Sequence, residues 1–230
     1  YRIVSLIGSG PQGDVYLAVS NGEKYAIKML ISMPTMSMAK RPVEFERFVE
    51  ELKELSQSHK NIVKVMDYAE RPVPSIIMEY CDTNLRRLID EKKIDTKQAI
   101  KIIADIADAI SHVHYHFARV HLDIKPENIL ICKGVPKIGD WGLSEKLFMW
   151  RDEGYRGTPL YSAPEQFKEE YGSIDQRTDI WQLGCLLYEM LTGHPPFEAE
   201  DIAELVRKIL EEEPKRENID PKLWAVIRKA

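Results

Sequence analysis

The chain has few cysteines, no long apolar run and no block of one charge sign. Its three cysteines, Cys81, Cys132 and Cys185, are widely spaced among 230 residues, so the sequence predicts neither a disulfide framework nor a CxxC metal site. This usage is typical of a reducing compartment, and we expect a cytoplasmic protein. No stretch approaches the roughly 18 apolar residues of a membrane span, and no charged-then-apolar leader opens the chain.

Charge and composition narrow the class of protein further. The formal net charge is −5, and the acidic and basic residues, 30% of the chain, are interspersed. Without a basic block, neither a nucleic-acid partner nor a membrane-surface partner is expected. The 44% hydrophobic content can form a substantial core in one large domain or two lobes. Because the chain starts in strand-like and ends in helix-like sequence, we expect an excised piece, truncated at its C-terminus.

The first third of the chain has the alternation of β-strands. Residues 1–8, 13–19 and 24–30 show it, and Asn21-Gly22 between the last two is a strong hairpin signal. From Pro42 the apolar period becomes helical, and strand character returns at 61–70 and 75–80. We expect a mostly antiparallel sheet carrying one helix, whose apolar stripe is Phe45, Phe48, Val49, Leu52 and Leu55.

After Cys81 the pattern is largely helical. Residues 99–113 carry one long amphipathic stripe, and residues 178–193 are nearly all apolar, which predicts a buried helix. Between them, residues 120–165 are irregular and contain several Gly and Pro. Loops of that length in a compact domain are usually functional.

A glycine pattern near the start indicates a phosphate-binding loop. Gly8, Gly10 and Gly13 form G-x-G-x-x-G, and glycines let the backbone approach phosphate oxygens. Alone, this pattern is as compatible with a plain hairpin turn. A strand rather than a helix follows it, which argues against a dinucleotide site. Lys28 follows in "AIK" of the third strand, where a lysine could neutralise phosphate charge.

The segment "HLDIKPEN", residues 121–128, makes the resemblance to one protein family specific. With "GSGPQGDVY", "AIK", "DWG", "GTPLYSAPE" and "TDIWQLG" in this order, the chain resembles a eukaryotic-type (Hanks-type) Ser/Thr protein kinase domain. The resemblance implies an α+β, bilobal protein kinase fold with an antiparallel N-lobe sheet and a mainly helical C-lobe. Residues 1–80 would be the N-lobe, and residues 81–230 an incomplete C-lobe.

The resemblance also implies roles for single residues. Asp123 would orient the substrate hydroxyl, and Lys125 would stabilise the transferring phosphoryl group. Asn128 and Asp140 would hold Mg²⁺ ions on ATP. Asp179 would steady the catalytic loop without reacting. Phosphoryl transfer concentrates negative charge, so catalysis depends on positioning and preorganised cations.

The nucleotide site is implied in the same way. Met78 would be the gatekeeper, and the Glu79 carbonyl and Cys81 amide would make the hinge hydrogen bonds. Trp141, in place of the more common Phe, would pack beneath the nucleotide. The remaining positions expected around ATP are Val15, Ala26 and Leu130.

Lys28 needs a carboxylate partner from the helix that follows it. Glu44 and Glu51 border the apolar stripe, whereas Glu46, Glu50 and Glu54 share a polar face. We prefer Glu51 because Leu55 follows one turn later. Glu44 and Glu50 remain open.

Leu122 stands where many relatives have an arginine that grips a phosphorylated activation loop. The chain is therefore a non-RD variant, with HLD in place of HRD. It is expected to phosphorylate Ser or Thr of protein substrates, and leucine has no donor, so this activity should not need activation-loop phosphorylation.

Two rival functions are a nucleotide-binding pseudokinase scaffold and a small-molecule kinase. "GTPLYSAPE" argues against the second rival, because its kinase role is to shape a peptide-docking surface. Ser144, Tyr155 and Thr158 are the hydroxyls between "DWG" and "APE".

Three histidines, His112, His114 and His116, invite a metal interpretation. Only His112 and His116 could share a helix face. The helix macrodipole and solvent explain them more simply.

Overall fold

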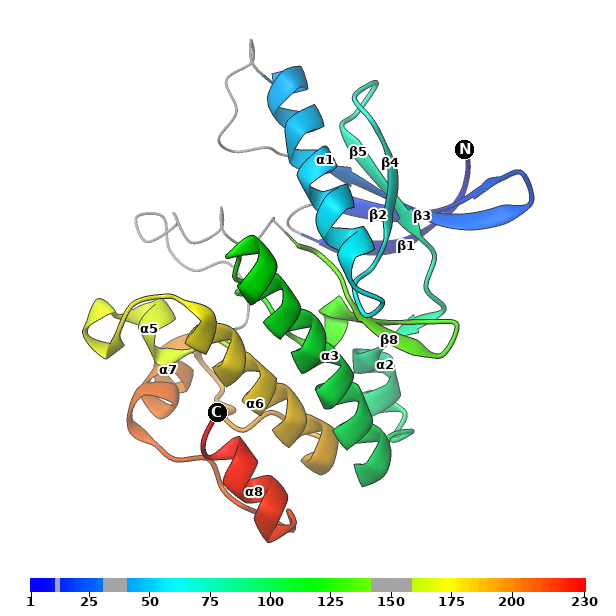
Figure 1. The fold of residues 1–230 in the computed structure, drawn as a ribbon. Helices are drawn as coiled ribbons and strands as arrows, with labels where there is room; N and C mark the ends of the chain where they lie inside the picture. Colours follow the sequence, from blue (N-terminus) through cyan, green and yellow to red (C-terminus); the bar gives the residue numbers. More distant parts are fainter. Residues whose placement is uncertain (11–12, 31–40, 142–158) are drawn as a thin grey trace.

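The computed structural model describes residues 1–10, 13–30, 41–141 and 159–230, with side chains of its first helix from Phe45 onward. Its N-terminal part is a five-stranded antiparallel sheet of order β1-β2-β3-β5-β4, accompanied by one long helix (Figure 1). The predicted sheet carrying one helix is therefore confirmed. The elements are β1 Arg2–Gly10, β2 Gly13–Ser20, β3 Glu23–Leu30, α1 Arg41–Ser58, β4 Val65–Ala69 and β5 Ser75–Glu79.

The hairpin between β2 and β3 forms at the predicted dipeptide. Asn21 and Gly22 both have positive φ, 52° and 81°, and Ser20 pairs with Glu23 across the turn. Asn and Gly tolerate this left-handed region, and a turn of this kind matches the twist of the strands. The turn fixes the register of β3 and therefore the face on which Lys28 lies.

Helix α1 packs through the predicted apolar stripe. Phe45, Val49, Leu52 and Leu55 are buried, and Phe48 is partly buried against the same core. Spacing of three and four residues places these side chains on one helix face. That face lies against β4, and Phe45 meets Tyr68 edge to face, with ring centroids 5.8 Å apart.

The C-terminal part is mainly helical. Helix α6 is buried along most of its length and packs on α3 (Figure 1), which confirms both predicted helices. Asp95 caps α3 with the help of Gln98. The elements are β6 Thr83–Asn84, α2 Leu85–Asp90, α3 Thr96–Phe117, η1 Pro126–Asn128, β7 Ile129–Cys132, β8 Val135–Ile138, α5 Pro164–Phe167, η3 Glu169–Tyr171, α6 Gln176–Thr192, α7 Ile202–Glu211 and α8 Pro221–Ile227.

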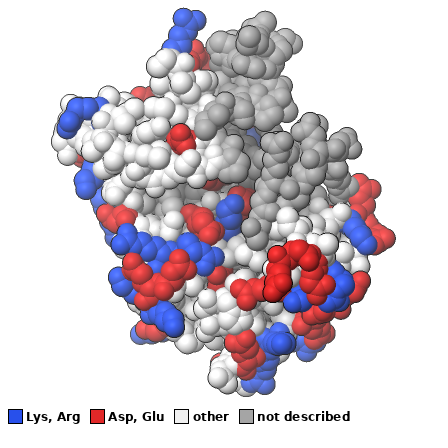
Figure 2. Space-filling view, turned by 180° about the vertical axis from the view of Figure 1, so that it is seen from behind, with Lys and Arg blue, Asp and Glu red and all other residues white. Residues whose placement is uncertain are grey.

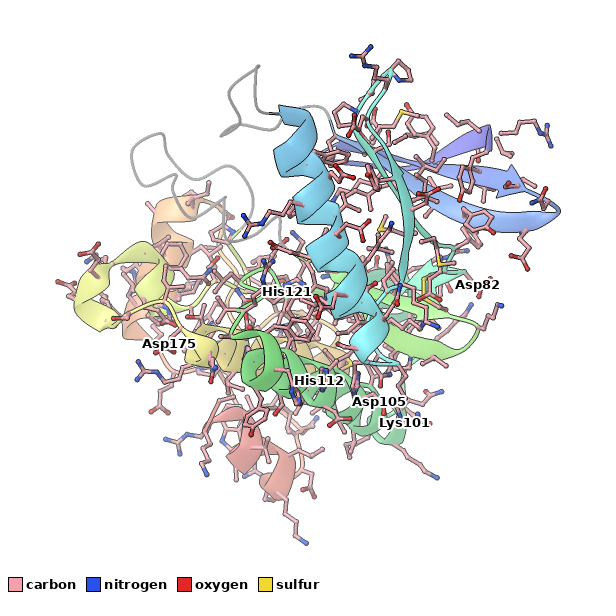
Figure 3. All side chains as sticks on the ribbon, turned by 45° about the horizontal axis from the view of Figure 1, so that its top comes forward. Asp82, Lys101, Asp105, His112, His121 and Asp175 are labelled. Atoms are coloured by element: carbon pink, nitrogen blue, oxygen red, sulfur yellow. A yellow bond between two sulfur atoms is a disulfide. The ribbon has the colours of Figure 1, made fainter. Side chains whose placement is uncertain are left out.

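The expectation that the cysteines form no disulfide is wrong for one pair. Cys81 and Cys132 are joined, with Cα atoms 4.1 Å apart, and the bond is visible beside Asp82 in Figure 3. The antiparallel pairing of β6 with β7, in which Thr83 faces Ile131, brings the two cysteines together. A separation of 51 residues hides this proximity in the sequence. The cysteines therefore no longer support the inference of a reducing compartment.

Surface charge and helix composition agree with the sequence. On the face in Figure 2, acidic and basic side chains are intermingled over the parts drawn in colour. None of the helices in the described ranges has the length and apolarity needed to cross a membrane.

Candidate active site

The buried carboxylate of Asp179 organises the segment that contains Asp123. Asp179 is fully buried in the first turn of α6 and accepts hydrogen bonds from the backbone N–H groups of His121 (2.8 Å) and Leu122 (2.7 Å). His114 Nε2 lies 2.7 Å from the same carboxylate. Buried charge requires such partners. Asp179 thus fixes the backbone of the two residues that precede Asp123.

Gln182, one turn further along α6, makes hydrogen bonds to the backbone of the same loop. Its amide oxygen accepts from the N–H of Ile124 (2.8 Å), and its Nε2 donates to the carbonyl of Leu122 (3.0 Å). Leu122 itself has φ 66° and a 6% exposed side chain. A non-glycine residue in this region needs support from its surroundings, and Asp179 and Gln182 provide it.

The Asp123 carboxylate is oriented from both sides. Lys125 Nζ donates to its Oδ1 at 2.9 Å, and Asn128 Nδ2 donates to its Oδ2 at 2.9 Å and to its backbone carbonyl at 2.7 Å. The Asp123 side chain is 30% exposed. It is thus held in one orientation while remaining accessible to a substrate.

Lys28 and Asp140 meet between the two parts of the fold. Lys28, on β3, donates from Nζ to Oδ1 of Asp140 at 2.9 Å, and their side chains are 6% and 34% exposed. Asp140 has φ 61° and directly follows Gly139, where an added Cβ would lie 3.3 Å from Val63 Cγ2. The pair places a cation and a carboxylate, 112 residues apart in the chain, at one point.

The β7–β8 hairpin brings Asn128 close to Asp140 in the fold. Ile129 pairs with Ile138, and the N–H of Gly139 donates to the carbonyl of Asn128 at 2.9 Å. The two residues expected to hold metal therefore lie at the same end of one hairpin. No cluster of three or more metal-ligating His, Cys, Asp or Glu side chains occurs within the described ranges.

Trp141 packs into the core beside these residues. Its ring is 6% exposed and meets His121 edge to face, with centroids 4.6 Å apart. His121 in turn donates from Nε2 to the Gly139 carbonyl (2.8 Å) and accepts from the Asp123 N–H (3.3 Å). This ring therefore ties the loop of Asp123 to the segment of Asp140.

The preferred partner of Lys28, Glu51, is engaged elsewhere. Its carboxylate accepts from Arg119 and, at 3.2 Å, from Arg47. The described contacts of Glu51 thus point toward Arg119, in the turn that precedes His121. Glu44 lies outside the described side chains, so the pairing of Lys28 with a helix glutamate remains a prediction.

The three glycines of the loop differ in their surroundings. Gly13 has φ 148°, and a Cβ there would lie 2.0 Å from the carbonyl oxygen of Met29. Among the described residues, a Cβ at Gly10 would meet nothing within 4 Å, and a Cβ at Gly8 would meet only Val15, at 3.7 Å. Close packing therefore requires glycine at position 13, whereas the other two leave room for an approaching ligand.

Strand pairing places several of the residues that were predicted to contact the nucleotide. Ala26 pairs with Met78 across β3 and β5, and Val15 pairs with Lys28 across β2 and β3. Glu79 accepts from Lys137 Nζ at 2.6 Å, and Leu130 faces Asn84. A pocket beside Lys28 and Asp140 is lined by Leu52, Leu55, Ser56, Val63, Val65, Ile76, Met78, Gly139 and Trp141.

The sequence did not reveal a partly buried network around Arg86. Arg86 of α2 donates to Glu189 (2.7 Å), Glu127 (2.9 Å) and the hydroxyl of Tyr161 (2.7 Å), and Tyr161 donates to Glu189 at 2.5 Å. Burial, followed by the Glu189 carboxylate, raises the pKa of Tyr161. Arg86 thus braces α2 against α6, the turn before Asn128 and the "GTPLYSAPE" segment. No sequence motif marks this arginine.

The histidines form two groups with different contacts. His112 and His116 share a helix face as predicted, with ring centroids 4.5 Å apart, and His59 lies 5.3 Å from His112. His114 points instead to Asp179. Ser144, Tyr155 and Thr158 lie outside the described residues.

Two parts of the fold supply the charged groups. Lys28 comes from the sheet, whereas Asp123, Asn128 and Asp140 come from the helical part. This division, with a buried helix holding the loop of Asp123, is the architecture of the protein kinase class. The family described as protein kinase domain matches residues 1–228. The chain belongs to this family, and the Hanks-type resemblance is confirmed.

The curated relatives carry Ser/Thr kinase names. The serine/threonine-protein kinase PknB of Mycolicibacterium smegmatis is 32% identical over 251 residues, which cover 100% of this chain and 39% of the relative. The probable serine/threonine-protein kinase PknB of Corynebacterium glutamicum is 33% identical, over 93% of this chain and 34% of the relative. The serine/threonine-protein kinase 36 of Pongo abelii is 31% identical, over 92% and 16%. The chain thus spans 39% or less of the length of these relatives.

Proposed function

We propose that this domain transfers the γ-phosphoryl group of ATP to Ser or Thr hydroxyls of protein substrates. The observation that carries the proposal is the Asp123 carboxylate, fixed on one side by Lys125 and on the other by Asn128. A carboxylate held in this way can accept the proton of a substrate hydroxyl while a neighbouring ammonium faces the transferring group. The Ser/Thr kinase names of the relatives support the same reaction class.

Lys28 would neutralise charge on the α- and β-phosphates of ATP. Its ammonium is nearly buried beside Asp140, where electrostatic interactions are stronger than in water. The Gly-rich loop supports this placement, because Gly8 and Gly10 leave the backbone open above the strand. The Glu79 carbonyl and the Cys81 amide would bind adenine.

The residues at the end of the β7–β8 hairpin fit Mg²⁺. Asn128 directs its Nδ2 at Asp123, which leaves its amide oxygen on the other side, and Asp140 offers a carboxylate. Mg²⁺ prefers hard oxygen ligands and is usually held by one or two carboxylates together with substrate phosphates. Asn128 and Asp140 would therefore hold the ion. When bound, it would neutralise charge on the phosphate oxygens.

Leu122 would affect how the kinase is regulated, and would not affect the phosphoryl-transfer step itself. Its backbone N–H and carbonyl are engaged by Asp179 and Gln182, and its side chain is buried and has no donor. The grip of an arginine on a phosphorylated loop cannot form here. We therefore propose that activity does not depend on activation-loop phosphorylation. Phosphatase-treated protein should keep its turnover, and loss of most of it would contradict this part of the proposal.

One observation favours a second function, a catalytically weak nucleotide-binding scaffold. Glu51 contacts Arg119 and Arg47, an arrangement that draws it toward the turn before His121. A domain fixed in this state would bind ATP and transfer phosphate slowly.

The two functions are separated by a transfer assay with labelled ATP, Mg²⁺ and a generic Ser/Thr substrate. Wild type should label the substrate, whereas Asp123→Asn should not, because asparagine cannot accept the hydroxyl proton. Lys28→Met should also lose turnover, with Lys24→Met on the same strand as the matched control. Equal labelling by wild type and Asp123→Asn would refute the mechanism. ATP binding without labelling by either protein would favour the scaffold.

A further inference from the structure

The disulfide between Cys81 and Cys132 joins the connection between the two parts of the fold to the hairpin below it. Cys81 lies two residues after β5 ends, and Cys132 is the last residue of β7. Figure 3 shows the bond beside Asp82, which precedes β6. The bond therefore sits where the sheet passes into the helical part.

The cross-link is accessible from one side. Cys81 is partly exposed, whereas Cys132 is 3% exposed. Of the two sulfurs, that of Cys81 is therefore the one that a small thiol would attack, with the Cys132 sulfur as the departing group. Cys185, the remaining cysteine, is a natural contrast, because burial raises the pKa of its thiol and keeps it unreactive.

Other contacts hold the same region when the bond is open. The N–H of Asp82 donates to the Ile131 carbonyl at 3.0 Å, and its carboxylate accepts from the Lys133 N–H at 3.1 Å. Glu79 and Lys137 add an ion pair at 2.6 Å. These contacts would keep the chain folded after reduction. Cys81 itself would lose its covalent link to β7, and its backbone could then shift within the limits that these contacts set.

We propose that Cys81 and Cys132 form a redox modification site that controls nucleotide binding. The inference rests on the proposed function, in which the Cys81 amide binds adenine, and on the expectation that Leu130, two residues before Cys132, lies beside ATP. The closed bond holds the hinge amide at a fixed distance from β7, so the site is preorganised. Opening it allows the two sides to separate, and nucleotide binding then has to order them again.

The redox step is an ordinary exchange with a dithiol. A thiolate of the dithiol attacks the Cys81 sulfur, a mixed disulfide forms, and the Cys132 thiolate leaves and takes up a proton. The second thiol of the reagent then displaces Cys81. Two electrons and two protons pass from the dithiol to the protein, and the reagent ends as a cyclic disulfide. A low-molecular-weight disulfide reverses the step.

The test measures the Kd of ADP by calorimetry in oxidised and dithiothreitol-reduced wild type. Alkylation of the denatured protein, followed by mass spectrometry, counts the free thiols in each sample. We expect Kd to rise about fivefold on reduction, at the lower end of typical coupling between sites. By linkage, saturating ADP should lower the ratio of reduced to oxidised protein at a fixed dithiothreitol ratio by the same factor.

Two variants locate the effect. Cys132→Ser should bind ADP as the reduced wild type does and ignore dithiothreitol, whereas Cys185→Ala should keep the full response. Equal Kd values in the two redox states, a response that persists in Cys132→Ser, or three free thiols in the oxidised protein would each overturn the proposal. Failure of both states to bind ADP would overturn the proposed function as well. Equal Kd values would leave that function standing.

Discussion

Replacing Asp179 by asparagine should loosen the loop of Asp123 and destabilise the domain. The carboxylate is fully buried and accepts from His121 and Leu122, with His114 at 2.7 Å. Asparagine keeps only one acceptor oxygen, so its NH₂ group must face at least one of these donors. Loss of a hydrogen bond to a charged group costs about 1.5–3 kcal/mol, and a donor left unsatisfied adds to this. We expect the free energy of unfolding to fall by about 3 kcal/mol.

Urea denaturation followed by tryptophan fluorescence measures this change, and the four tryptophans provide the signal. The matched control is Asp105→Asn, because Asp105 forms an i,i+4 pair with the 74% exposed Lys101. Pairs of this kind contribute about 0.3–0.5 kcal/mol. Without urea, where the variant is folded, the turnover of Asp179→Asn should also be lower than that of wild type. A loss of stability no larger than that of Asp105→Asn would refute the role assigned to Asp179.

Three further predictions concern the residues that the motifs do not mark. Arg86→Met should lower the free energy of unfolding by about 3–5 kcal/mol, because the Glu189 carboxylate, 1% exposed, loses its cation; urea denaturation measures it. Arg119→Gln should raise kcat several-fold in steady-state kinetics, because it releases Glu51 toward Lys28. Burial, followed by the charges of nearby histidines, lowers the pKa of His112 from 6.5. The unfolded chain therefore binds this proton more readily, and stability should fall as pH drops from 6.5 through the folded value. Wild type should accordingly lose more stability than His112→Gln between about pH 7.5 and 5.5.

Matched variants check each of these. Arg87→Met, next in α2 with a 68% exposed side chain, should cost little stability, and a loss as large as that of Arg86→Met would contradict the brace. Arg47→Gln, 83% exposed, should change kcat less than Arg119→Gln does. Parallel pH curves for wild type and His112→Gln would show that another group governs the acid response.

The motif residues could be predicted because their order along the chain is itself a signal. Lys28, Asp123, Asn128 and Asp140 lie in short segments whose sequence and spacing point to one fold, and the structure brings them together in that fold. The hairpin at Asn21 was predictable from local backbone preference alone.

Other features depend on contacts between distant segments. The Cys81–Cys132 bond requires the register of β6 on β7, which no local pattern specifies. Arg86 looks like a surface residue until α6 supplies Glu189. For Glu51, the sequence identifies a helix face, but the position of the whole helix decides whether the carboxylate meets Lys28 or Arg119.

The surroundings of the three glycines show that one sequence motif combines two independent requirements. At Gly13 the backbone of Met29 excludes any side chain, whatever the domain binds, so a harmful substitution there reports on folding. At Gly10 no described residue lies within reach of an added methyl group, so a harmful substitution there would report on the ligand. A mutational survey of this loop that weights its glycines equally would therefore mix loss of protein with loss of binding.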